Sequence, residues 1–138
     1  MDNSLFLSII ILLLIAALFV MASLNTKKID KKKREKLIKE LYSLEKSINS
    51  DELAIRRDAI IKLDNILSKS LQHYFGNDAS CGENLKSAKK IFRKREYNNL
   101  WEAHKIRNRI VHSDYAVSKE EARKVLQIYK LSISKILK

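Results

Sequence analysis

Apolar residues recur every three or four positions along most of this chain, which is the spacing of an amphipathic helix. The stripe Leu37, Leu41, Leu44 and Ile48 is an example, with charged residues between its members. The chain has no proline and only two glycines, so few positions interrupt a helix. We find no convincing strand pattern, internal repeat or low-complexity segment. The pattern therefore predicts an all-α protein.

The N-terminal segment differs from the rest because it is apolar on every face. No charged residue occurs from Leu5 to Leu24, a run that spans about 30 Å as a helix and matches the hydrocarbon thickness of a bilayer. A core helix of this kind would have too little protein around it in so small a chain. A cleaved signal peptide is the stronger alternative, but no positive charge precedes the run, and the run is longer than usual. We expect residues 1–26 to form a retained transmembrane anchor.

A basic run follows the apolar segment directly. Because positive residues beside a membrane helix tend to remain in the cytoplasm, this run predicts a single-pass protein of the cell membrane with its C-terminal domain in the cytoplasm. The same side chains are expected to meet anionic headgroups at the membrane surface. A nucleic-acid-binding patch is the alternative interpretation. The residues concerned are Lys27, Lys28, Lys31, Lys32, Lys33 and Arg34.

The remainder divides into a basic juxtamembrane helical stalk, residues 27–49, and a helical domain, residues 50–138. Ser50 is the expected N-cap of a long helix that runs to about Phe75, with Asp51 and Glu52 in its first turn. The stretch Gly76–Gly82 reads as a loop. The apolar stripe of the long helix predicts burial of Ala59, Ile60, Leu63, Leu67, Leu71 and Tyr74.

Three further helices are expected after this loop. Residues 83–94 form a short one, marked by Leu85, Ala88 and Phe92, and residues 97–112 form the next. Ser118 with Glu121 is the pattern of a capping box that opens the last helix. The prediction is thus a single N-terminal transmembrane helix followed by a four- to five-helix bundle. Its last two helices should bury Leu100, Ala103, Ile106, Ile110 and Val111, and then Ala122, Val125, Leu126, Tyr129, Ile133 and Ile136.

A polar strip interrupts the apolar pattern of the helix over residues 97–112. Asn108 and His112 are four residues apart and share a face, Arg107 is adjacent, and His104 extends the strip by one turn. RNA carries its own nucleophile, the 2′-hydroxyl, so its cleavage needs only a proton-transfer group and a cation that stabilises the phosphate. Histidine and arginine supply these, and asparagine can orient either. The structural alternative is a histidine favoured at a helix C-terminus beside an ordinary surface arginine.

The segment around this strip resembles the C-terminal half of HEPN domains. These are small helical bundles with the signature R-N-x-x-x-H, which reads Arg107-Asn108-x-x-x-His112 here, followed by a break and an amphipathic helix. The stretch Arg56–Leu71 is similar to the long second helix of that family, and Gly82–Phe92 to its short third helix. The resemblance covers about residues 50–138, a HEPN-like helical domain, and leaves out the apolar and basic segments.

The resemblance implies a metal-independent endoribonuclease that acts as a homodimer. It implies that Arg107 binds phosphate, that His112 is the acid or base and that Asn108 orients them, with Asp64 near the cleft; a solvated surface acid is the alternative for Asp64. One toxin subgroup has a tyrosine where Asp114 stands here, so the resemblance does not extend to that subgroup. An antitoxin or another protein is a possible partner. Because the family also has non-catalytic members, a membrane-tethered dimerisation or partner-binding module remains the alternative function.

Charge and cysteine content add little. The net charge of +12 is compatible with RNA as a partner but does not identify one. The single cysteine, Cys81, has no partner for an internal disulfide, in keeping with a reducing compartment. The sequence has neither a glycine-rich phosphate loop nor the spacing of a metal site, so we expect no cofactor and no metal. The RNA target, any protein partner and the physiological trigger stay open.

Overall fold

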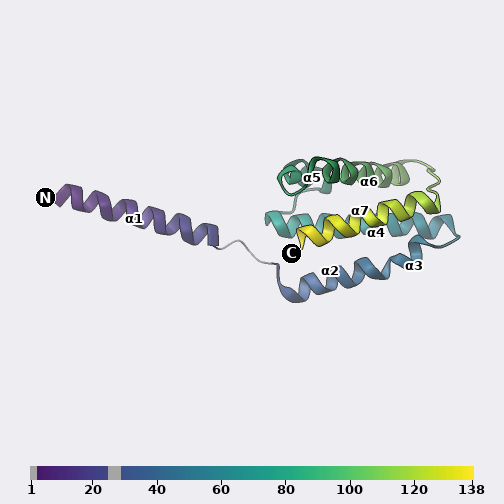
Figure 1. The fold of residues 1–138 in the computed structure, drawn as a ribbon, viewed down its shortest axis with the longest axis horizontal. Coiled ribbons are helices and arrows are strands. Elements are labelled where there is room, and N and C mark those ends of the chain that lie inside the picture. The colour runs from purple at the N-terminus through teal and green to yellow at the C-terminus, as the bar shows by residue number, and fades with distance from the viewer. Residues whose placement is uncertain (1–2, 25–28) are drawn as a thin grey trace.

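The computed structural model describes residues 3–24 and 29–138, with the side chains of residues 3–21 and 29–138 (Figure 1). Every regular element in these residues is helical, which confirms the predicted all-α class, with an N-terminal apolar helix followed by a helical bundle. Lys27 and Lys28, two of the predicted membrane-surface residues, lie outside the described residues. The elements are α1 (Asn3–Leu24), α2 (Lys31–Ser43), α3 (Glu45–Ile48), α4 (Leu53–Phe75), α5 (Cys81–Ser87), the 3-10 turn η1 (Ala88–Lys90), α6 (Lys94–His112) and α7 (Lys119–Ile136).

Helix α1 is apolar on all its faces and exposed over the side chains that the structure describes. Its stretch Asn3–Met21 has a mean hydropathy of 3.0, and none of it is buried. In Figure 1 it lies outside the bundle. The length and composition of α1 fit the span of a bilayer, and its place near the N-terminus is equally that of a signal sequence.

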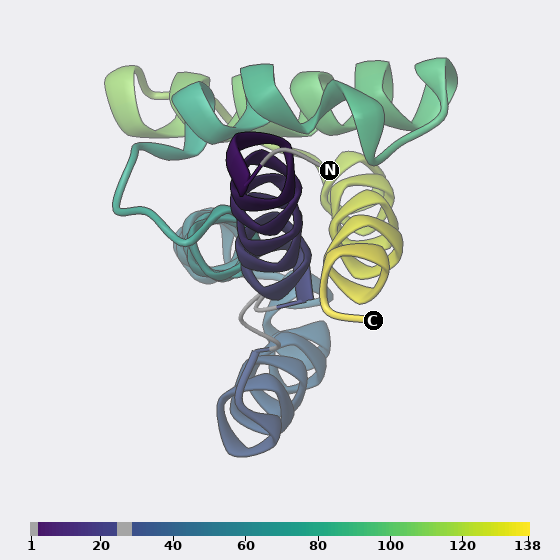
Figure 2. The ribbon, with the colours of Figure 1, turned by 90° about the vertical axis from the view of Figure 1, so that its left-hand side faces the viewer.

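The long helix α4 is the centre of the bundle. It packs against α7, α5, α6, α3 and α2, and α6 and α3 also pack against α7. Figure 1 shows the resulting layers, with α5 and α6 on one side of the α4 and α7 pair and with α2 and α3 on the other. Figure 2, the view turned by 90°, looks roughly along α4 and α7 and shows α5 and α6 running across one side of them.

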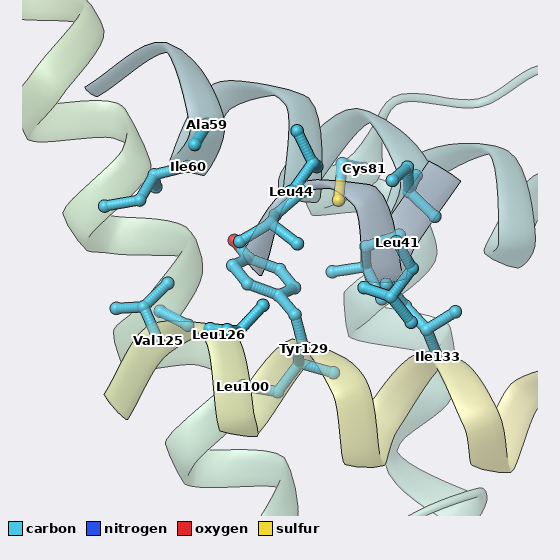
Figure 3. Packing of buried hydrophobic residues seen from close by; sticks show 14 of the residues in the cluster. Leu41, Leu44, Ala59, Ile60, Cys81, Leu100, Val125, Leu126, Tyr129 and Ile133 are labelled. Atoms are coloured by element: carbon cyan, nitrogen blue, oxygen red, sulfur yellow. The ribbon is translucent and has the colours of Figure 1, made fainter. Parts of the chain in front are cut away.

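The core is built from the stripes that the sequence predicts. Figure 3 shows the ring of Tyr129 among Leu44, Leu100 and Leu126. The predicted burial is wrong for Tyr74, which is 55% exposed, and for Val111, which is 45% exposed. Both residues continue the apolar pattern of their helix, but they lie in its last turn, where no neighbouring helix covers them.

Helices α2 and α3 belong to this core as well. Leu37, Leu41, Leu44 and Ile48 are buried, which confirms the predicted stripe, and they pack on α4 and α7. The basic segment that follows α1 is therefore a packed part of the bundle from Leu37 onward. The expected continuous helix is divided at Leu44, which is the C-cap of α2 and the N-cap of α3.

The expected N-cap at Ser50 is wrong, because α4 begins three residues later, at Leu53. The buried Arg56 explains the shift. Its Nη1 donates to the carbonyl oxygens of Ser50 and Asp51, both at 2.9 Å, and its Nε and Nη2 donate to the carbonyl of Val117. The guanidinium of Arg56 thus bonds to the carbonyls that would accept helical hydrogen bonds if Ser50 were the N-cap. It also links this turn to Val117, just before α7.

Three helix boundaries near the polar strip are set by short-range bonds. Ser80 and Glu83 form a capping box, so α5 begins at Cys81, earlier than residue 83. Helix α6 begins at Lys94, earlier than Tyr97, because the Glu96 carboxylate accepts the backbone N–H of Arg93 at 2.8 Å. Gly76 ends α4 in the left-handed conformation, with φ 64°, which glycine adopts without strain.

Ser118 caps α7 as predicted, since its hydroxyl accepts the N–H of Glu121 at 3.1 Å. The second half of the expected capping box does not form. The Glu121 carboxylate instead accepts the hydroxyl of Tyr115 at 2.8 Å and lies 3.7 Å from Arg109. These contacts hold the segment between α6 and α7 against both helices.

Candidate active site

A polar cleft of about 350 Å³ lies between α4, the start of α5 and α6. It brings together four residues that the sequence singles out, because α4 and α6 pack against each other and α5 closes one side. His112 does not line it. The lining residues are Asp64, Asn65, Ser68, Ser80, Cys81, Gly82, His104, Arg107 and Asn108.

Asp64 is the buried anchor of this cleft. It is 2% exposed, so the alternative of a solvated surface acid is wrong. Its Oδ1 accepts the hydroxyl of Tyr129 at 2.8 Å and lies 2.8 Å from Nδ1 of His104. Because a carboxylate only accepts hydrogen bonds, Nδ1 carries the hydrogen of this bond, and in the neutral form of the ring Nε2 is then the acceptor nitrogen. A buried acid therefore fixes the tautomer and the orientation of His104.

The free nitrogen of His104 faces the cleft. The residue is 7% exposed, and no hydrogen bond to Nε2 is made by the residues that the structure describes. Nε2 is also not among their fully buried unpaired atoms. Gly82 lies beside this nitrogen, since a Cβ added to Gly82 would be in van der Waals contact with Nε2 at 3.7 Å. The ring of Trp101 packs edge-on against His104, with 5.9 Å between centroids.

Arg107 presents its guanidinium beside this histidine. Its Nη1 donates to Oδ1 of Asn108 at 3.0 Å, and its Nε lies 3.5 Å from Oδ2 of Asp64. Among the described residues, Nε is the buried side-chain nitrogen without a hydrogen-bond partner. The side chain of Arg107 is 26% exposed, so its guanidinium lies between the buried Asp64 and the open cleft. This arrangement suits an anionic group entering the cleft.

Two neutral donors complete the surroundings of Asp64. Burial, and then the charge of Asp64, raise the pKa of the Cys81 thiol far above its ordinary value. The same causes raise the pKa of Tyr129. Both groups stay protonated at neutral pH. A polar role of either residue was not predictable from the sequence, because Tyr129 fits an apolar stripe and a lone cysteine carries little information.

Asp64, Cys81 and His104 are also the residue types of a metal site, and their ligand atoms lie within 4.8 Å of one another. A metal would require the Cys81 thiolate, which burial disfavours. It would also sit beside the guanidinium of Arg107, which repels a cation. The donor set fits a hydrogen-bonded network better than a metal ion, and we assign no metal to it.

His112 is the last residue of α6 and is exposed. It follows Asn108 by one helical turn, so it lies farther along the strip that faces the cleft. Tyr115, which follows Asp114, is engaged elsewhere, with Glu121 and under the guanidinium of Arg109 at 4.1 Å. The basic residues Lys31, Lys32, Lys33 and Arg34 are exposed in α2.

Comparison of the chain with protein-family models, curated proteins and solved structures yields no match. The chemistry of the site is therefore argued from its own geometry. A histidine oriented by a buried carboxylate, a guanidinium and an amide share one open cleft. These groups are able to move a proton and to stabilise a phosphate at the same place.

Proposed function

We propose that this protein is a membrane-anchored, HEPN-like endoribonuclease that cleaves RNA in the cytoplasm without a metal ion. The observation that carries the proposal is the cleft in which Arg107 and Asn108 lie beside His104, whose Nδ1 is held by the buried Asp64. The R-N-x-x-x-H spacing supports the family assignment. The site needs a substrate that brings its own nucleophile, and RNA does so.

The reaction follows from these groups. Nε2 of His104 accepts the proton of a ribose 2′-hydroxyl, and the 2′-oxygen forms a bond to the adjacent phosphorus. Arg107 stabilises the charge that develops on the phosphate oxygens, and Asn108 holds the guanidinium through its 3.0 Å bond. The bond from phosphorus to the 5′-oxygen breaks, and His112 donates a proton to that oxygen. The products are a 2′,3′-cyclic phosphate and a 5′-hydroxyl.

The order of these residues along α6 suits an in-line displacement. The attacking and leaving oxygens lie on opposite sides of the phosphorus, so the base and the acid should flank the phosphate-binding residues. His104 and His112 stand four residues to either side of Asn108, on one strip of the helix and about 12 Å apart along its axis. The helix thus carries a base, a phosphate-binding pair and an acid in the required sequence.

A second copy of the chain is the proposed partner. His112 is exposed at the end of α6 and outside the cleft lining, so it is free to contribute to a cleft shared by two motifs in a homodimer. The basic residues after α1 support retention of the domain on the cytoplasmic side, with α1 as the anchor.

A non-catalytic tethered binding module is the second candidate. It is favoured by the contacts of Asp64, which join α4, α6 and α7 and would stabilise the bundle without any substrate. For this candidate, the polar network is a structural tie, and the cleft binds no scissile phosphate.

The test uses the full chain in neutral detergent with single-stranded RNA and a chelator. We expect cleavage, products that end in a 2′,3′-cyclic phosphate, and no cleavage of a DNA strand of the same sequence. Replacing a single ribose by deoxyribose should abolish cleavage at that linkage alone. Intact RNA, or products with a 3′-hydroxyl, would contradict the proposal and favour the binding module.

A further inference from the structure

A second cleft, of about 450 Å³, lies between α2 and the C-terminal half of α4. Helix α2 lies on the side of α4 away from α5 and α6 (Figure 1). The lining of the cleft combines residues that are remote in sequence, because α2 packs along α4. The residues are Lys33, Lys36, Leu37, Glu40, Lys69, Gln72, His73 and Asn77. We propose that this cleft binds the phosphate of an anionic membrane lipid headgroup.

The positive charge of this cleft is not neutralised within the chain. Lys33, Lys36 and Lys69 form no ion pair with any residue that the structure describes, and Glu40 is the one acid in the lining. Some lysines of the bundle do pair, as Lys62 does with Asp58 at 2.7 Å. Three lysines around one hollow, with one acid beside them, give the cleft a net positive charge that attracts an anion.

The neutral donors of the cleft are already engaged. Nε2 of Gln72 donates to the carbonyl of Ala79 at 3.0 Å, and Nδ2 of Asn77 donates to Asn84 at 2.8 Å. Burial, and then the charge of Lys33, lower the pKa of His73, which lines the same cleft. Recognition therefore rests on charge, which suits a phosphate better than a sugar or an amide.

The place of the cleft in the chain favours a lipid as the source of that phosphate. Six residues lie between Leu24, the end of α1, and Lys31, so the seven steps from Leu24 to Lys31 span at most about 25 Å at 3.3–3.6 Å each. With α1 in the bilayer, the start of α2 stays close to the headgroups, which attract basic residues. This step rests on the membrane anchoring proposed above and is independent of RNA cleavage.

Lys69 distinguishes lipid binding in the cleft from nonspecific attraction of anionic lipid to the basic residues that follow α1. Lys33 and Lys36 belong to the run that follows α1, whereas Lys69 reaches the cleft only through the packing of α4 against α2. A disordered basic segment would bind lipid without Lys69. A binding site formed by the packing of α4 against α2 requires Lys69.

The experiment places the full chain in bilayers of phosphatidylcholine with a minority of phosphatidylglycerol. The protein is extracted in mild detergent, and the lipids that remain bound are quantified by mass spectrometry. We expect phosphatidylglycerol to be enriched on the wild type and reduced several-fold by Lys69→Gln. Glu40→Gln, which removes the one acid, should increase the enrichment. Lys89→Gln makes the same charge change in the exposed turn η1, outside the cleft, and should have no effect.

Equal enrichment on Lys69→Gln and Lys89→Gln would overturn the proposal. Two further arms titrate the detergent-solubilised chain with inorganic phosphate and with single-stranded RNA. Displacement of the bound lipid by phosphate at low concentration would make a soluble anion the ligand. Loss of RNA binding in Lys69→Gln without loss of lipid would assign the cleft to RNA. A chain that fails to enter the bilayers refutes the anchoring itself, whatever the cleft variants do.

Discussion

Asp64 on α4 and His104 on α6 are joined by a buried hydrogen bond of 2.8 Å, between Oδ1 of the acid and Nδ1 of the imidazole. The same oxygen accepts the hydroxyl of Tyr129 on α7, so three helices meet at one carboxylate. The second oxygen, Oδ2, faces the guanidinium of Arg107 at 3.5 Å. This acid therefore has two roles, since it stabilises the bundle and orients the groups of the cleft.

Asp64→Ala tests the first of these roles. The substitution leaves His104, Tyr129 and Arg107 without their shared acceptor, and breaking a buried pair of this kind costs about 3–5 kcal/mol. We expect the free energy of unfolding of the chain in detergent to fall by that order, as measured by circular dichroism in urea. The exposed Asp58, which pairs only with Lys62, is the control, and its replacement by alanine should cost at most about 1 kcal/mol. Equal losses in the two variants would contradict the account.

The thiol of Cys81 gives a prediction about pH. Its pKa is raised in the folded chain, so the folded state keeps the proton while the unfolded chain releases it above about pH 8.5. The free energy of unfolding should therefore decline as the pH rises through the ordinary thiol range. Cys81→Ala lacks this contribution, so the difference between the two chains should narrow or reverse between neutral and alkaline pH. Parallel stability curves would show that the thiol ionises equally in both states.

The contribution of α2 and α3 to the core is tested by truncation. A chain that starts at Lys31 retains the buried Leu37, Leu41, Leu44 and Ile48, whereas a chain that starts at Ser50 loses all four. Removing a buried leucine or isoleucine side chain typically costs about 2–5 kcal/mol. We expect the longer chain to be helical with a cooperative thermal transition and the shorter one to lack such a transition. Similar melting curves would place these leucines outside the essential core.

Arg107→Lys separates charge from geometry in the cleft. Lysine keeps the cation but loses the planar fork that bonds Asn108 and faces Asp64. We expect RNA cleavage to slow at least about tenfold while the helical content is unchanged. Arg95→Lys on the first turn of α6, where the side chain is exposed, is the matched control and should cleave at the wild-type rate. A fully active Arg107→Lys would remove two-point phosphate binding from the mechanism.

The helices and their buried faces were predicted well from the sequence, because apolar residues recur at helical spacing along most of the chain. The stripes over α2, α3, α4 and α7 are regular, and the hydroxyl of Ser118 caps α7 as its sequence indicates. Predicted helix caps were wrong where a side chain from outside the cap formed a hydrogen bond with a group of that cap. Arg56 donates to the carbonyl of Ser50, and the hydroxyl of Tyr115 donates to the carboxylate of Glu121.

Only part of the candidate site could be predicted from the sequence, because some of its contacts join residues that are distant along the chain. Arg107, Asn108 and His104 are neighbours on one helix, so their spacing alone places them on one strip. The bonds of Asp64 cross 40 residues to His104 and 65 to Tyr129, and no local pattern encodes such pairs. Gly82 likewise reads as a loop residue in the sequence, and only the structure places it beside Nε2 of His104.

The central claim is that His104 and His112 transfer the protons of RNA cleavage on either side of Arg107. His104→Asn places an amide near the position of Nδ1, so it retains the bond to Asp64 but has no Nε2 to accept a proton. His112→Ala removes the proposed acid from an exposed position, where it contributes little to stability. Arg95→Ala is the control for a contaminating ribonuclease, because it is purified in the same way and lies on the same helix.

The decisive measurement is the single-turnover rate of RNA cleavage by these four proteins in the presence of a chelator. The account predicts that His104→Asn and His112→Ala each lower the rate by about 10²–10⁴-fold, with folded helical spectra, while Arg95→Ala matches the wild type. A wild type that leaves RNA intact, or histidine variants that cleave as fast as the wild type, would contradict it.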